Sequence, residues 1–138
     1  MELVLNPTVQ TGEWTFLPEE VEMMRKLYAE SLLLTPGSLH ILRENTVYHV
    51  AKVLATDDHG VHIRIYSNRW QAPPRSINPS SLVLGAESVE QDPGIGHLPF
   101  TKRAFLAQGP IFLQEDTVTE EELDGFRMWE EAQGGYFA

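Results

Sequence analysis

Residues 47–66, which read VYHVAKVLATDDHGVHIRIY, decide the fold of this chain. Two runs rich in β-branched and aromatic side chains, 47–56 and 61–66, flank the short segment Asp57-Asp58-His59-Gly60. Such runs are typical of strands, and an Asp- and Gly-containing turn between them is a strong hairpin signal. The sequence therefore predicts a two-stranded antiparallel hairpin in the middle of the chain.

The side-chain pattern distinguishes two registers of this hairpin. With a loop of two or four residues, Lys52 shares a face with Ile63 and Ile65, which would bury a lysine. With Gly60 in the left-handed position of a three-residue loop and a G1 bulge, Ala55 faces Ile63 instead. We expect the second register, because it gives one coherent apolar face.

The opposite face of the expected hairpin mixes aromatic and cationic side chains. In that register Lys52 faces Tyr66, and Tyr48 approaches Trp70. Pairs of this kind are common on ordinary sheets, so the simpler interpretation is structural. The alternative is a face that binds a small ligand or is associated with nucleic acid, and its six residues are Tyr48, Lys52, Arg64, Tyr66, Arg69 and Trp70.

Helices are expected on both sides of the strands. Residues 17–34 have helical spacing, with Pro18 at the first helical position. The side chains expected to face the core are Val21, Met24, Leu27, Tyr28 and Leu32. Thr101 is expected to cap a short helix that ends before Gly109. Further strands are expected at residues 2–5, 38–42, 81–84 and 111–113, and a loop over residues 87–100.

These elements predict an α+β domain that covers residues 1–138. Its core is a small twisted antiparallel sheet or an SH3-like partial barrel, flanked by an N-terminal helix and a C-terminal acidic helix. The comparison with small SH3-like or Tudor-like barrels rests on the order of short strands, since the spacing of an aromatic cage is absent.

The C-terminal helix has the clearest start signal in the chain. Thr119 is a suitable N-cap, Glu122 lies three positions later as in a capping box, and Val118 and Leu123 occupy the positions of a hydrophobic staple. Eight acidic residues and one base lie between Glu115 and Glu131, so this element contributes strongly to the net charge of -10. A cationic protein partner would relieve the repulsion along this face.

Composition narrows the function classes. The chain has no cysteine, which excludes disulfides, thiolate metal sites and cysteine nucleophiles. No signal peptide or membrane-spanning apolar run is present, so a cytoplasmic protein without membrane attachment is expected. The negative net charge disfavours nucleic-acid binding.

No pattern of catalytic or cofactor-binding residues stands out. The five histidines form no metal motif, the segment Gly94-Ile95-Gly96 lacks the remainder of a phosphate-binding loop, and no Gly-x-Ser-x-Gly sequence occurs. We therefore expect a non-enzymatic protein without metal or cofactor. His97 lies between a glycine pair and a proline, where it makes either a structural hydrogen bond or a contact with a partner.

The chain has a general resemblance to small bacterial immunity proteins of polymorphic toxin systems. Two segments carry this resemblance, 94–100 (GIGHLPF) and 118–135 (VTEEELDGFRMWEEAQGG). The resemblance implies an inhibitor that binds a cognate, often basic, toxin and blocks its active site with acidic side chains. The expected partner-binding residues are Glu120, Glu121, Asp124, Glu131 and His97.

Overall fold

The computed structural model describes residues 10–11, 14–15, 17–85 and 94–138, with the backbone alone for residues 10, 11, 14, 15 and 27. Contacts divide the chain into two compact units, Met1–Leu32 and Leu33–Ala138. The prediction of one domain over residues 1–138 stays a prediction. The strand expected at residues 2–5 lies outside the described residues.

The first unit contains a small strand pair and one helix. Strands β1 (Gln10–Thr11) and β2 (Trp14–Thr15) are antiparallel, and helix α1 spans Pro18–Ser31 with its proline at the predicted place. Val21 is buried as expected. Tyr28 and Leu32 are exposed, so the prediction that they face the core was wrong.

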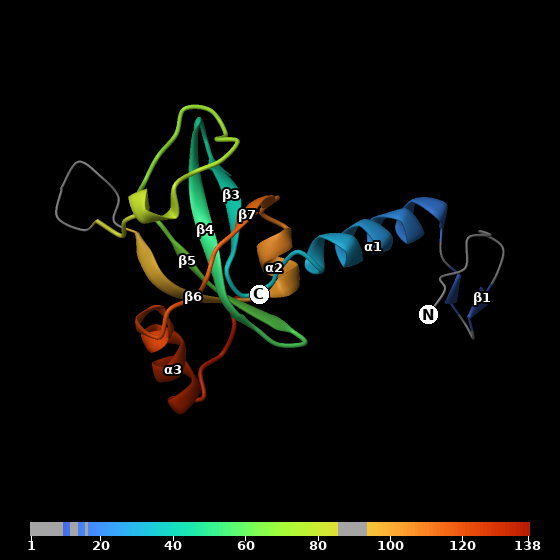
Figure 1. Ribbon diagram of the computed structural model, residues 1–138. Helices are drawn as coiled ribbons and strands as arrows, with labels where there is room; N and C mark the ends of the chain where they lie inside the picture. The colour runs from blue at the N-terminus through green and yellow to red at the C-terminus, as the bar shows by residue number, and fades with distance from the viewer. Residues whose placement is uncertain (1–9, 12–13, 16, 86–93) are drawn as a thin grey trace. The chain divides into compact units, whose positions relative to one another are not determined.

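The second unit is built on a five-stranded antiparallel sheet with the strand order β6-β5-β4-β3-β7 (Figure 1). The strands are β3 (Ser38–Glu44), β4 (Val47–Thr56), β5 (Gly60–Ile65), β6 (Ile95–Thr101) and β7 (Ile111–Glu115). Helices and an antiparallel sheet together confirm the α+β fold class. No pairing joins β6 to β7 in the part of the chain that the structure describes, so this sheet is open.

The central hairpin is present, but the expected register with a three-residue loop was wrong, since the pairing next to the loop is that of the four-residue alternative. Thr56 pairs with Val61 across a four-residue loop, and a bulge at Leu54 then shifts the pairing so that Lys52 lies opposite Arg64. The loop is stabilised by the Asp57 carboxylate, which accepts hydrogen bonds from the backbone N–H groups of the two residues that follow Asp58. Both alternatives considered from the sequence have one register along the whole hairpin, whereas the bulge changes the register midway.

One face of the sheet packs against helix α2 (Lys102–Leu106). Phe105 of this helix is fully buried and lies in a core with Val53, Ile63 and Leu34. Thr101 caps α2 as predicted, since its hydroxyl accepts from the backbone N–H of Ala104. The opposite face has its own apolar cluster, which includes Leu39, Val50 and Tyr66. Both faces of the sheet are therefore covered by other parts of the same unit.

Strand β6 was predicted as a loop, because Gly96 and Pro99 are unusual in strands. Proline cannot donate to a ladder, yet it is tolerated on an edge strand, and β6 is an edge of this sheet. The backbone of Phe137 lies along the outer side of β6 and bonds to Pro99 and Thr101. The strand expected at residues 81–84 is absent; a short 3-10 helix η1 (Pro79–Ser81) precedes extended chain there.

Gly37 and Gly109 provide a matched pair of substitutions, because both have positive φ, at 94° and 69°. A Cβ on Gly37 would overlap the carbonyl oxygen of Asp116, whereas a Cβ on Gly109 would meet nothing within 4 Å. Urea denaturation followed by far-UV circular dichroism should show that G109A lowers the free energy of unfolding by about 1 kcal/mol. G37A should lower it by about 2 kcal/mol more. Equal losses would contradict the close approach of Asp116 to Gly37.

Candidate functional site

Lys52 lies in β4 and is only 2% exposed. Its Nζ donates to Asp116 Oδ2 and to both carboxylate oxygens of Glu122 at 3.0 Å, and also to the backbone carbonyl of Thr117. We call these four residues the lysine clamp. A buried ammonium is stable only when its donors have partners. All three partners lie in the segment that follows β7. The burial of Lys52 therefore holds residues 116–122 on the sheet.

The carboxylates of the lysine clamp are stabilised in their charged form. Burial raises the pKa of Asp116, but the hydrogen bonds and the positive charge of Lys52 outweigh it, and this pKa lies below its usual value. The pKa of Glu122 is lowered in the same way against the effect of burial. Arg64 Nη1 lies 3.5 Å from Glu122 Oε2. Two cations thus face two carboxylates, and the charges of this cluster balance.

Glu122 also closes the predicted capping box. The Thr119 N–H donates to Glu122 Oε1 at 2.9 Å, and the Glu122 N–H donates to Thr119 Oγ1 at 3.3 Å. The chain then forms a 3-10 turn, η2 (Glu121–Leu123), and continues as helix α3 (Asp124–Glu131). One carboxylate therefore serves both the helix start and the lysine clamp, which ties the position of α3 to Lys52.

A chain of hydrogen bonds beneath α3 forms a second anchor. His97 Nε2 lies 2.9 Å from His62 Nδ1, and His62 Nε2 lies 2.9 Å from Tyr136 Oη. Tyr136 Oη donates to Asp57 Oδ2 at 2.6 Å. We call Asp57, Tyr136, His62 and His97 the histidine chain. It links the hairpin loop, β5, β6 and the C-terminal residues.

The carboxylate at one end sets the direction of every bond in the histidine chain. An ionised Asp57 only accepts, so Tyr136 donates to it and accepts from His62 Nε2–H. His62 Nδ1 is then an acceptor, and His97 donates to it from Nε2–H. Burial, together with the neighbouring His97, lowers the pKa of His62 to about 4, and the pKa of His97 is also lowered by burial. Both imidazoles are therefore neutral at pH 7.

Aromatic side chains of α3 pack directly on this network. The rings of Phe126 and Trp129 meet the ring of His62 edge-on, with centroid separations of 4.6 and 4.4 Å. A Cβ on Gly125 would lie 2.7 Å from the Cβ of His97, so only glycine allows this approach. Phe126 and Trp129 thus form the apolar inner side of α3.

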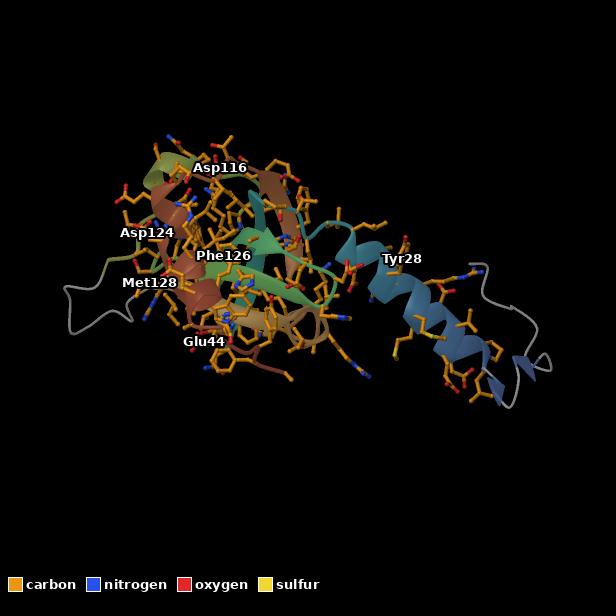
Figure 2. All side chains as sticks on the ribbon, turned by 90° about the horizontal axis from the view of Figure 1, so that it is seen from below. Tyr28, Glu44, Asp116, Asp124, Phe126 and Met128 are labelled. Carbon is orange, nitrogen blue, oxygen red and sulfur yellow. The ribbon has the colours of Figure 1, made fainter. Side chains whose placement is uncertain are left out.

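The outer face of α3 and the preceding turn is acidic. Its exposed carboxylates belong to Glu120, Glu121, Asp124, Glu130 and Glu131. Among them only Glu120 has an ion pair within the described part of the chain, and its partner is Arg127. Met128 lies on the same helix with 70% of its surface exposed. Figure 2 shows Asp124 and Met128 on α3, together with the inward Phe126.

The predicted partner-binding residues are thus only partly brought together. Glu120, Glu121, Asp124 and Glu131 are exposed along one short element. His97 is separate from them, because it lies half-buried beneath Gly125 and bonds to His62. Its expected structural hydrogen bond is present. Sequence reasoning missed His62, Tyr136 and Asp57, whose positions in the chain carry no local signal for this arrangement.

The alternative binding face is not an open surface, which corrects its expected exposure. Lys52 and Tyr66 are buried, and Arg64 is half-buried beside Glu122. Tyr48 and Trp70 are bridged through their backbones as predicted, and Arg69 is exposed. Three of the six residues, Lys52, Arg64 and Tyr66, line an open cavity of about 330 Å³, whose cations are already paired with acids of the same chain. A ligand-binding or nucleic-acid-associated role for this face stays a prediction.

Comparison with known proteins identifies no relative, since no family model, curated protein or solved structure matches the chain. Among the described residues, no group of three or more His, Asp or Glu side chains is placed to hold a metal ion. No helix in the described ranges is long and apolar enough to cross a membrane.

Replacing Lys52 with methionine tests the lysine clamp. K52M leaves Asp116 and Glu122 facing each other without their cation, and breaking a buried pair from one side costs about 3–5 kcal/mol. Because both carboxylates retain some exposure, we expect the free energy of unfolding to fall by roughly 2–4 kcal/mol in urea denaturation. E122Q in the K52M background should recover part of this loss.

Lys26 is the matched control for this substitution, because it is exposed and its pairing with Glu30 spans 4.0 Å. K26M should change the free energy of unfolding by less than about 0.5 kcal/mol. A K52M protein that is as stable as K26M would show that the clamp carries no stability.

The histidine chain predicts a loss of stability in mild acid. The lowered pKa of His62 means that the unfolded state binds a proton between pH 6.5 and 4 and the folded state does not. The contribution of neutral His62 to the free energy of unfolding is fully present above pH 6.5. It falls by roughly 3 kcal/mol as the pH approaches 4. Urea midpoints between pH 7 and 4 should fall less steeply for H62Q than for the wild type.

His40 contributes a similar loss of stability between pH 6.5 and 4, because burial lowers its pKa to about 4. The H62Q substitution does not remove this contribution of His40. H59Q, which alters an exposed turn histidine, should keep the full wild-type slope. If H62Q and H59Q gave the same pH profile, His62 would not be titrating as the histidine chain requires.

Proposed function

We propose that this chain is a non-enzymatic protein-binding domain whose acidic C-terminal face engages a cationic protein. The observation that carries the proposal is the way α3 is held. Its inner side is fixed by the lysine clamp and by packing on the histidine chain, while Glu121, Asp124 and Glu131 remain exposed and without ion pairs in the described chain. These carboxylates form a fixed array and do not belong to a loose acidic tail.

Fixed like charges at close spacing oppose folding, and an oppositely charged partner removes this repulsion on binding. The half-buried acids of the segment, Asp116 and Glu122, are neutralised within the chain. The exposed ones are not, so their field extends into solvent. Met128, exposed among them, supplies an adaptable apolar contact of the kind used at binding surfaces.

The most concrete form of the proposal is an immunity-type inhibitor in the cytoplasm that neutralises a basic toxin domain. The net charge of -10 would steer such a partner from a distance, and carboxylates at the rim of an interface act mainly on the association rate. Binding should therefore be fast at low salt and slow at high salt. An active site that uses lysine or arginine would be blocked by the same acidic face.

The test compares two variants with the same change in net charge. E121Q/D124N/E131Q neutralises three carboxylates of the acidic face, and E19Q/E20Q/E22Q neutralises three exposed carboxylates of α1. Each protein is used to capture partners from a lysate of the source cells at low salt, and the captured basic protein is then purified. Association rates with it are measured across a range of salt concentrations.

We expect the acidic-face variant to associate roughly tenfold more slowly than the wild type at low salt, with a flatter salt dependence. The α1 variant should associate at close to the wild-type rate. The immunity-type reading further requires that the wild-type chain restores growth of cells that express the partner. Equal rates for both variants at every salt concentration would remove the acidic face from the mechanism.

A further inference from the structure

The histidine chain has room for one additional proton. At neutral pH each of its three bonds contains one hydrogen, and the ionised Asp57 sets their direction. The far end of the chain is His97 Nδ1, a lone pair without a hydrogen-bond partner in the part of the chain that the structure describes. A first proton taken up by this atom leaves all three bonds intact.

A second proton on the two histidines breaks the chain. His62 Nδ1 and His97 Nε2 lie 2.9 Å apart, and each would then carry a hydrogen, so the bond between them would become a repulsive contact. The two rings are also stacked, with centroids 5.1 Å apart and planes 12° from parallel. Two imidazolium charges at this separation disfavour each other. The folded arrangement therefore accepts one proton on this pair and excludes the second.

The surroundings of His62 offer little to offset a second charge. Besides His97, the titratable groups that face it among the described residues are Tyr136 at the C-terminus and, beyond it, Asp57 in the hairpin loop. Helix α3 contributes two aromatic rings, and the residue opposite in β4 is Ala55. One carboxylate balances one imidazolium, and the second imidazolium has no counter-charge here.

The segment that covers His62 is the least firmly anchored part of the second unit. No residue from 107 to 138 is fully buried, and Phe126 and Trp129 are half-buried. The strands beneath, β5 and β6, are joined by a backbone ladder, whereas the last residues add the backbone bonds of Phe137 to β6. Regions with few buried contacts open at a lower free energy than the core. Residues 124–138 are therefore the part that moves when the pair becomes charged.

The lysine clamp keeps its charges under the same conditions. The pKa values of Asp116 and Glu122 are both lowered by their bonds to Lys52, so these carboxylates remain mainly ionised at about pH 4.5. A histidine released from the chain has an ordinary pKa of about 6.5 and is protonated at that pH. In mild acid the anchor at His62 weakens while the anchor at Lys52 persists.

We propose that the histidine chain is a pH-sensitive switch: when His62 and His97 both take up a proton, residues 124–138 detach from the sheet, while the lysine clamp keeps residues 116–122 in place. Detachment ends the fixed position of α3, so mild acid loosens the acidic face. This consequence for binding rests on the proposed function. The detachment itself does not, and its test needs no partner.

The test is native-state hydrogen exchange of the full ¹⁵N-labelled chain, with rates corrected for the intrinsic effect of pH. At pH 4.5 a free imidazole is protonated over neutral by about 100 to 1, so the second proton favours the open form by about 100-fold relative to pH 7. We expect the protection of the hydrogen-bonded amides of Ala132, Gly134 and Phe137 to fall by about this factor. Their protection should be lower than that of β4 amides at both pH values.

Three glutamine variants assign the effect to the histidine pair. In H62Q and H97Q an amide replaces one imidazole, keeps a donor and an acceptor, and cannot be charged. The remaining histidine takes up one proton, which the chain accommodates, so protection should fall by less than about tenfold. H59Q alters an exposed turn histidine and should retain the fall of about 100-fold.

Three results would overturn the switch. The first is protection of Ala132, Gly134 and Phe137 that does not change between the two pH values. The second is protection equal to that of β4 amides at both, since the segment would then open only with the whole unit. The third is an equal fall in H62Q, H97Q and H59Q. If a glutamine variant does not fold at pH 7, the comparison of the C-terminal amides with β4 in the wild type still decides.

Discussion

The structure of the second unit depends on one buried ammonium group. Lys52 lies in a central strand, where an unpaired charge would be too costly to bury. Its donors are satisfied only when the residues after β7 cross the sheet and bring Asp116, Thr117 and Glu122 to it. Glu122 is also the capping-box residue, so the same contact sets where the final helix begins. The position of α3 therefore depends on the hydrogen bonds and ion pairs that Lys52 requires.

The acidic residues of the C-terminal segment therefore have two separate roles. Asp116 and Glu122 face inward and balance Lys52 and Arg64. Those on the outer side of α3 have no ion pair with any described residue, apart from Glu120 with Arg127. Once α3 is fixed on its inner side by aromatic packing on His62, its outer carboxylates are held in a rigid array. This division is the basis of the proposal that a cationic partner binds the outer face of α3.

Structures that depend on neighbouring residues could be predicted from the sequence. Contacts between residues far apart in the chain could not. The hairpin strands, the cap at Thr101 and the capping box at Thr119 depend on neighbours within a few residues, and all are present. The expected register was wrong because the loop has four residues and a bulge at Leu54 changes the pairing within the hairpin. The burial of Lys52 on the opposite face was also not predicted. Its partners lie 64 to 70 positions away, and no local pattern announces them. Tyr136 is likewise 74 and 79 positions away from His62 and Asp57, its partners in the histidine chain.

The ¹⁵N NMR spectrum of the lysine side chains at neutral pH tests directly whether Lys52 is buried beneath the C-terminal segment. An ammonium group held by two carboxylates and a carbonyl exchanges its protons slowly and shows contacts with Thr117 and Glu122. We predict such a resonance for Lys52, while the exposed Lys26 exchanges too fast to be observed. If both side chains exchanged equally fast, Lys52 would not be buried beneath the C-terminal segment and would not hold α3 in place.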